Sequence, residues 1–250
     1  MPSAIWTPAA LSSERRPYSG DVWRMVEAQH RVSTLKLVDT LDEQAILEQA
    51  IEAAKPIVPE PCRHLHFLLA TPFRYEPPYP NGSRFRRPGY TLGVFYAAEA
   101  VETAVAELAF YRLLFFSESP GTEPPLGAAE YTAFAATIAT EAALDLTRPP
   151  LSRDAMIWRH PTDYGPCQSL ADIARELDVD VLRYESVRDP ERRANIAVLT
   201  CATFARNDVR NRQTWWLRVG SAGVQAIREF PDLRLEFSRA AFGSDPRLTR

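Results

Sequence analysis

Residues 92–117, LGVFYAAEAVETAVAELAFYRLLFFS, decide the fold class because they join a short apolar strand to a long helix. Residues 92–98 are small or apolar, as expected of a buried strand. From Val101 to Ser117 no proline or glycine interrupts the sequence, and apolar residues recur at helical spacing. The expected stripe consists of Val101, Ala104, Val105, Leu108, Tyr111 and Phe115. We therefore expect a chain that combines strands with amphipathic helices.

Glu107 lies at the edge of that stripe. At about 100° per residue, its side chain falls roughly 100° from the centre of the apolar face. A carboxylate in this position is neither fully solvated nor fully buried, which suits a group that meets a ligand. A salt bridge along the helix face, for instance with Arg112, is the alternative explanation.

An arginine-rich loop precedes the strand. Residues 71–89, TPFRYEPPYPNGSRFRRPG, place four arginines among prolines and aromatic residues, namely Arg74, Arg84, Arg86 and Arg87. Guanidinium groups bind phosphate oxygens through paired hydrogen bonds, and loops carry binding residues more often than core strands do. The loop is compatible with a phosphate-bearing small molecule, and equally with a solvated basic surface.

A strand and a helix are expected before this loop. A strand at residues 63–69 would turn His64 and His66 to the same side, which is half of a metal site. No carboxylate or cysteine at a suitable spacing completes such a site, so we expect no metal there and interpret the histidines as one polar strand face. Thr40 and Glu43 form a capping-box pattern, which predicts a helix that ends before Pro56.

Residues 21–26 have the alternation of a short strand, with Arg24 between Val22 and Val26 on one face. An arginine on an apolar face is either a structural ion-pair partner or a ligand-binding group. Residues 1–20 are rich in serine and proline and are expected to form a loose N-terminal arm.

The second half of the chain alternates strand and helix patterns. Strands are expected at residues 131–138, 143–147, 179–184, 195–199, 213–219 and 233–237, and helices at residues 169–177 and 224–230. Ser169 opens the first of these helices with a capping-box pattern. Ser186 and Arg188 lie in a loop between two strands, where side chains are fixed and still reach solvent. No GxSxG sequence surrounds Ser186, which argues against a serine hydrolase.

Composition limits the class of protein. The 250 residues are 46% hydrophobic and 24% charged, which is enough for one large domain with a sizeable core. The formal charge of -3 argues against nucleic acid as a partner. Cys62, Cys167 and Cys201 suggest neither a disulfide framework nor a zinc ribbon and are expected as small apolar core residues. No stretch has the pattern of a signal peptide or a membrane span, so we expect a cytoplasmic protein without a membrane partner.

Taken in order, several of these features resemble the RES domain family, which is named after an arginine, a glutamate and a serine. The matching pieces are Trp23-Arg24, Ser83-Arg84-Phe85, Val94-Phe95-Tyr96, Ala106-Glu107-Leu108, Tyr184-Glu185-Ser186-Val187-Arg188 and Asn195-Ile196-Ala197. The resemblance extends over about residues 21–199. It implies a single RES-like domain at residues 21–250 with an insertion at about residues 30–80, because the two arginines are farther apart than in compact members. The usual Gly-Arg-Trp of the family is Ser83-Arg84-Phe85 here.

The resemblance implies a compact α+β fold like that of bacterial ADP-ribosylating toxins, with mixed or antiparallel strands and flanking helices. It implies an enzyme that cleaves the nicotinamide–ribose bond of NAD, as a glycohydrolase or phosphorylase, with NAD as substrate and no cofactor. Family members commonly act as toxins paired with an Xre-like helix-turn-helix antitoxin, and a homo-oligomer is left open. The alternatives are ADP-ribosyl transfer to a protein and a non-catalytic NAD-binding module.

The resemblance also implies roles for the matched residues. Arg24 and Arg84 would bind the pyrophosphate, and Tyr96 would stack on the nicotinamide. Glu107 would stabilise the positive charge that develops on the ribose. The expected catalytic residues are Glu107, Arg84 and Ser186, and the expected NAD-binding residues are Arg24, Arg84, Tyr96, Ser186 and Asn195, with Ser186 positioning the ribose or amide and Asn195 in support.

Overall fold

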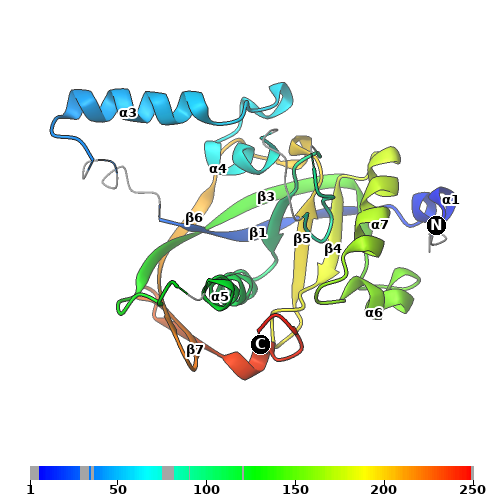
Figure 1. The fold of residues 1–250 in the computed structure, drawn as a ribbon. Helices are drawn as coiled ribbons and strands as arrows, with labels where there is room; N and C mark the ends of the chain where they lie inside the picture. Colours follow the sequence, from blue (N-terminus) through cyan, green and yellow to red (C-terminus); the bar gives the residue numbers. More distant parts are fainter. Residues whose placement is uncertain are drawn as a thin grey trace.

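The computed structural model describes residues 6–28, 34, 37–74, 82–89, 91–119 and 121–248. Within these residues eight strands form one sheet in the order β1-β2-β5-β4-β3-β6-β7-β8, with helices on both sides (Figure 1). The strands are β1 (Arg16–Glu27), β2 (Phe95–Ala98), β3 (Ala129–Asp145), β4 (Val181–Glu185), β5 (Ala194–Val198), β6 (Arg210–Gly220), β7 (Gly223–Arg228) and β8 (Leu233–Ser238). The expected α+β class, with mixed strands and flanking helices, is confirmed.

The long strand β3 organises the sheet. One edge of β3 pairs with β1, and its other edge pairs first with β6 and then with β4. Since β1 also pairs with β2, the strands β1, β2, β5, β4 and β3 close into a ring. The pairing of β3 with β4 is parallel, and the other pairings are antiparallel. The expected strands at 131–138 and 143–147 are therefore one continuous strand.

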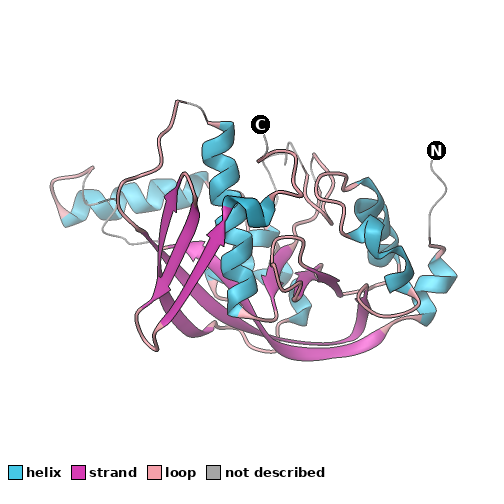
Figure 2. Cartoon of the chain, turned by 90° about the horizontal axis from the view of Figure 1, so that it is seen from below, coloured by secondary structure: helices cyan, strands magenta, loops and turns pink. Residues whose placement is uncertain are grey.

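Helix α5 (Val101–Glu118) covers one face of the sheet, as Figure 2 shows from below. It packs on β1, β2, β6, β7 and β8. The helix is confirmed, but its buried face differs from the expected stripe, because Ala106, Ala109, Phe110 and Leu113 are buried whereas Tyr111 and Phe115 are 50% and 47% exposed. The helix contacts strands β1 and β2 and also strands β6, β7 and β8, which together bury a wider arc of the helix than a single stripe.

The opposite face of the sheet carries η1 (Glu60–Cys62), α4 (Phe67–Ala70) and η2 (Thr71–Phe73). The strand expected at residues 63–69 is wrong. Leu65 and Leu69, four residues apart, are the buried side chains, and the His66 ring accepts a hydrogen bond from the amide of Leu68 at 3.2 Å. Burial at this spacing favours a helical turn over a strand.

The cysteines also differ from expectation, because Cys62 and Cys201 form a disulfide. Their Cα atoms are 5.8 Å apart, and the bond joins η1 to η4 (Cys201–Thr203), which follows β5. Both side chains are buried, as expected of core residues, and Cys167 is a free buried thiol. The sequence did not indicate that Cys62 pairs with Cys201, because the two cysteines are 139 residues apart and form no local spacing motif.

A third group of helices packs beside β4 and β5: α1 (Pro8–Ser13), η3 (Leu151–Asp154), α6 (Ala155–Trp158) and α7 (Gly165–Glu176). Regular structure thus begins before Gly20, since Leu11 is fully buried and the Trp6 indole donates to Asp154 at 2.8 Å. Helix α7 begins at Gly165 with a proline in its first turn, rather than at the predicted Ser169 cap.

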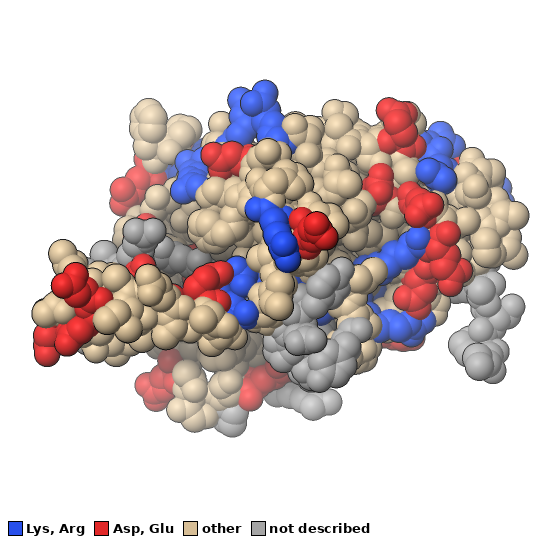
Figure 3. Space-filling view, turned by 90° about the horizontal axis from the view of Figure 1, so that it is seen from above, with Lys and Arg blue, Asp and Glu red and all other residues tan. Residues whose placement is uncertain are grey.

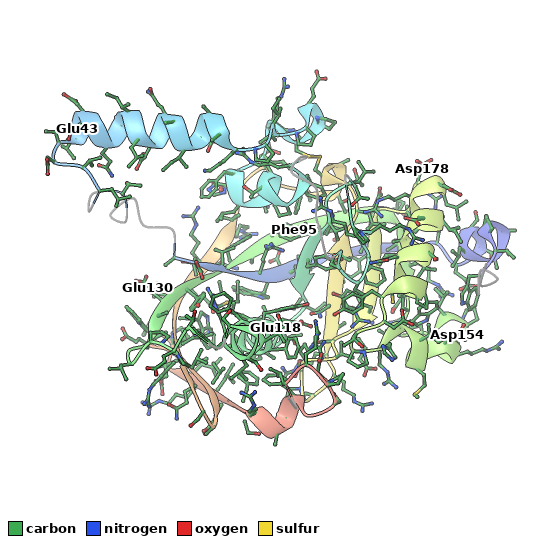
Figure 4. All side chains as sticks on the ribbon, viewed as in Figure 1. Glu43, Phe95, Glu118, Glu130, Asp154 and Asp178 are labelled. Carbon is green, nitrogen blue, oxygen red and sulfur yellow. A yellow bond between two sulfur atoms is a disulfide. The ribbon has the colours of Figure 1, made fainter. Side chains whose placement is uncertain are left out.

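Helix α3 (Leu41–Ala54) lies apart from the sheet and buries none of its side chains. The predicted capping box is confirmed, since Thr40 accepts from the Glu43 amide and the Glu43 side chain accepts from the Thr40 amide. Glu43 marks the far tip of the helix in Figure 4. On the face shown in Figure 3, acidic and basic side chains are interspersed, with acidic residues at this tip.

The C-terminal strands complete the fold. The helix expected at residues 224–230 is wrong, because Val224 and Ala226 are buried while Gln225 and Ile227 face outward in β7. This period of two is the pattern of a strand. Residues 239–242 form η5 (Arg239–Phe242), which places Phe242 against Phe110 of α5 at 5.6 Å between ring centres. No helix in the described part of the chain is long and apolar enough to span a membrane.

Candidate functional site

Glu107 of α5 is the centre of a compact polar group. The Ser186 hydroxyl donates to its Oε1 at 2.7 Å, and the Asn195 amide donates to the same oxygen at 2.5 Å. Within the described residues Oε2 accepts no hydrogen bond, and the side chain is half-buried. We call Glu107, Ser186 and Asn195 the glutamate cluster. The carboxylate is therefore fixed through one oxygen and presents the other.

Ser186 holds the carboxylate from inside the protein. Its oxygen accepts hydrogen bonds from the amides of Arg188 at 3.2 Å and Asp189 at 3.1 Å, so its proton points to Glu107. The residue is 1% exposed. Ser186 thus orients Glu107 and does not face solvent.

The two elements that supply the cluster are tied to each other. The Thr103 hydroxyl, one turn before Glu107 on α5, donates to Asp189 at 2.6 Å. Asn195 lies on β5 opposite Tyr184 of β4 and Ala98 of β2, which fixes its side chain on the α5 face of the sheet. The structure thus brings Ser186 and Asn195 into contact with Glu107. Arg112, the alternative salt-bridge partner expected for Glu107, pairs with Glu27 instead.

Arg84 is the arginine of the 71–89 loop that lies near the cluster. It is 7% exposed, donates to the carbonyl of Trp158 at 2.5 Å, and lies 4.9 Å from the ring centre of Tyr164. Burial lowers the pKa of Arg84, whereas the nearby thiol of Cys167, the phenols of Tyr184 and Tyr164 and, to a smaller extent, Glu107 raise it, and the net direction is upward. A buried cation therefore lies near enough to Glu107 to interact with it electrostatically.

The other arginines of the loop have structural partners. Arg74 pairs with Glu52, Arg87 pairs with Asp172, and Arg86 donates to Thr91. These three arginines are therefore held by partners within the protein, and only Arg87 is classed as exposed. Residues 75–81 lie outside the described residues.

Tyr96 on β2 supports the Arg84 loop. Its hydroxyl is 2.8 Å from the Ser83 hydroxyl and accepts the amide proton of Phe85 at 2.9 Å. These contacts bracket Arg84 on both sides along the chain. The Tyr96 hydroxyl therefore helps to hold the backbone of the loop around Arg84 in place.

Arg24 approaches Tyr96 from the opposite face of the sheet. Its neighbours Trp23 and Met25 pack toward α5, so Arg24 points the other way, over the Phe95 ring at 5.1 Å. Its guanidinium donates to the backbone carbonyl of Tyr96 at 2.6 Å. Phe95, which precedes Tyr96 on β2, is labelled in Figure 4. Arg24 therefore contacts the strand that carries Tyr96.

Two tyrosines complete the surroundings of Glu107. The pKa of the Tyr111 hydroxyl is raised by burial first, and then by Tyr164 and Glu107, while Arg188 and Arg84 lower it. The hydroxyl thus lies among these four groups, although half of the Tyr111 side chain is exposed. Tyr111 therefore combines a partly exposed side chain with charged and polar neighbours.

Sequence reasoning missed the contribution of the C-terminal segment. Asp245 is fully buried and pairs with Arg188 at 2.7 Å and with Arg247 at 2.8 Å. The Arg188 guanidinium lies 3.7 Å from the centre of the Phe110 ring, and the Arg188 amide donates a hydrogen bond to the Ser186 hydroxyl. Asp245 and Arg188 are far apart in the sequence and belong to no common helical or strand pattern, so their ion pair could not be predicted from the sequence.

Metal ligation has no support in the described part of the chain, where no group of three or more His, Cys, Asp and Glu side chains could hold an ion. His66 is near Arg212 and Asp208 at the surface, away from the strand position expected for it.

Comparison with known proteins gives one family. A family model described as RES domain matches residues 58–220 of this chain. No curated protein matches the sequence. Among solved structures, the M. tuberculosis MbcT–MbcA toxin–antitoxin complex contains a similar chain, with 15% sequence identity and a TM-score of 0.46, over 83% of this chain and 92% of that chain.

Proposed function

Because the chain belongs to the RES domain family, we propose that it cleaves the nicotinamide–ribose bond of NAD and acts as the toxin of a toxin–antitoxin pair. NAD is the substrate in this proposal, and no cofactor takes part. An Xre-like antitoxin with a helix-turn-helix is the proposed partner.

The observation that carries the proposal is the state of Glu107. Two buried donors fix its Oε1, and Oε2 accepts no hydrogen bond from the described residues. A carboxylate held in this way can stabilise positive charge without reorganising, which is the condition for electrostatic catalysis. Departure of nicotinamide creates such a charge on the ribose.

The positive charge of Arg84 supports an anionic substrate. Its guanidinium is buried beside the cluster and matches phosphate oxygens in shape. We assign it to the pyrophosphate of NAD. Arg24 and Tyr96 hold the Arg84 side of the site in this proposal, Arg24 through the Tyr96 carbonyl and Tyr96 through Ser83 and Phe85.

The proposed reaction needs one bond to break and one to form. The bond between the nicotinamide nitrogen and the ribose C1 atom breaks, and its electron pair leaves with nicotinamide, which departs neutral. Glu107 stabilises the resulting cation. An acceptor oxygen then bonds to C1; where the acceptor is water, the second product is ADP-ribose and one proton goes to solvent.

Nicotinamide release from NAD by the purified protein tests the proposal. We expect release by the natural sequence and a loss of about 100-fold or more in Glu107→Gln, the magnitude seen when one transition-state contact is removed. Glu118→Gln is the matched control, because Glu118 is an exposed carboxylate at the far end of the same helix (Figure 4). Release that is absent, or equal in Glu107→Gln, would contradict the proposal.

The second product identifies the acceptor. ADP-ribose indicates water, a phosphorylated ADP-ribose indicates phosphate, and a mass gain on an added protein indicates transfer to that protein. Thermal stabilisation by NAD without any nicotinamide release would instead indicate a binding module.

A further inference from the structure

We propose that Tyr111 is the aromatic platform on which the nicotinamide ring of the substrate binds. The proposal rests on the proposed function and adds to it the residue that recognises the leaving group. It also assigns this contact to α5 rather than to β2.

The position of Tyr111 on α5 is the first argument. It follows Glu107 by four residues, so the two side chains lie one turn apart on the same side of the helix. A ligand whose ribose meets Glu107 therefore has Tyr111 within reach of the group attached to that ribose.

The exposure of Tyr111 is the second argument. Half of its side chain is exposed, and its ring meets Phe110 edge-to-face at 5.2 Å and 78°, which leaves ring surface uncovered. The Phe110 ring already carries the guanidinium of Arg188 at 3.7 Å and that of Arg247 at 5.4 Å. Among the described residues no guanidinium lies over the Tyr111 ring.

The chemistry of the ring is the third argument. Burial of its hydroxyl raises the pKa of Tyr111, and Tyr164 and Glu107 raise it further, so the phenol stays neutral at physiological pH. The face of a neutral phenol attracts a flat cation. The nicotinamide ring of NAD is cationic before cleavage and neutral afterwards, so this contact favours the oxidised substrate and weakens when nicotinamide is released.

Tyr96 is the alternative platform, and its contacts favour another role. Its hydroxyl is bonded to Ser83 and Phe85, and the side chain packs in the cluster with Phe85 and Tyr184. These contacts fix Tyr96 as support for the Arg84 loop.

The experiment measures binding rather than turnover. In the Glu107→Gln background, the dissociation constants of oxidised NAD and of NADH, whose nicotinamide ring is neutral, are compared by calorimetry. We expect a preference for oxidised NAD of about 3- to 30-fold, the range of one cation–π contact. Tyr111→Ala should abolish the preference, and Tyr111→Phe should keep it because the ring face remains.

Phe115→Ala is the matched control, because Phe115 is a similarly exposed aromatic residue one turn farther along α5. It should leave the preference unchanged. Thermal unfolding of each variant checks that the fold is intact. If Tyr111→Ala does not fold, Tyr111→Leu replaces it, because leucine keeps an apolar side chain without a ring face, and it should also abolish the preference.

The outcomes separate the inference from the proposed function. If nicotinamide is released from NAD but Tyr111→Ala keeps the preference, or Phe115→Ala loses it equally, Tyr111 is not the platform and the proposed function stands. If oxidised NAD and NADH bind equally in the Glu107→Gln background while the natural sequence releases nicotinamide, only the inference is overturned. If the natural sequence releases no nicotinamide and neither form of the dinucleotide binds, the proposed function and the inference are both overturned.

Discussion

The hydroxyl of Ser186 illustrates how the site works at the scale of one residue. The hydroxyl donates a hydrogen bond to Glu107, and its oxygen accepts hydrogen bonds from the backbone amides of Arg188 and Asp189. The sequence resemblance assigned Ser186 to the substrate. Its near-complete burial supports a role as a positioning residue that acts through Glu107.

Ser186→Ala tests this role. The substitution leaves two buried amides without their acceptor and frees one side of Glu107, which should cost about 1–3 kcal/mol of unfolding free energy. We expect the rate constant for nicotinamide release to fall at least about 10-fold, because Glu107 is no longer held in the orientation needed for catalysis. The apparent Michaelis constant should change little. Kinetics and thermal unfolding on one preparation provide both values. A larger effect on the Michaelis constant than on the rate constant would place Ser186 in contact with substrate.

Residue-scale features were predictable where local geometry sufficed. Helical periodicity placed Glu107 at the edge of a buried face, and the resemblance grouped it with Ser186 and Asn195. The contact of Arg188 with Asp245 was not predictable, because an ion pair between distant segments leaves no spacing pattern in the sequence.

At the scale of elements, strong local sequence signals gave correct predictions. The capping box at Thr40 begins α3, and the uninterrupted stretch after Val101 forms α5. Short segments failed, because four to seven residues of mixed polarity fit more than one structure. Residues 63–69 and 224–230 are such cases, and tertiary packing decided both.

Thr40→Ala tests the independence of α3. Removing the cap should destabilise the helix by about 1 kcal/mol. Because α3 buries no side chain, we expect faster amide hydrogen exchange within residues 41–54 and an unchanged melting temperature of the whole protein. A fall in the melting temperature of several degrees would show that α3 is part of the cooperative core. Thr34→Ala is a control for the neighbouring side-chain contacts of the helix with Glu48 and Gln44.

At the scale of the whole molecule, the ring of strands could not be predicted from sequence. Its closure depends on the pairing of β1 with β3, whose residues are more than a hundred positions apart. The sequence of a single strand does not indicate which distant strand it pairs with. The resemblance implied the class of fold, whereas the register, the disulfide and the packing of the C-terminal segment needed the structure.

The Cys62–Cys201 disulfide offers a test at this scale. It closes a loop of 139 residues, and a loop of this length stabilises the folded state by up to about 5 kcal/mol in the chain-entropy model. We expect a reductant to lower the melting temperature of the natural sequence. The Cys62→Ala, Cys201→Ala double variant should melt at the lower temperature with or without reductant. A melting temperature insensitive to reductant would show that the bond does not form in solution.

The contact between Asp245 and Arg188 has a consequence for the order of events during translation. A nascent chain that has emerged as far as β5 already contains Glu107, Ser186 and Asn195, but not the carboxylate that fastens Arg188. At about 5–20 residues per second, a ribosome needs several seconds to continue to Asp245. A chain still in synthesis therefore passes through a period in which Glu107 and its two donors are present, but Arg188 in the loop after Ser186 does not yet have its buried partner.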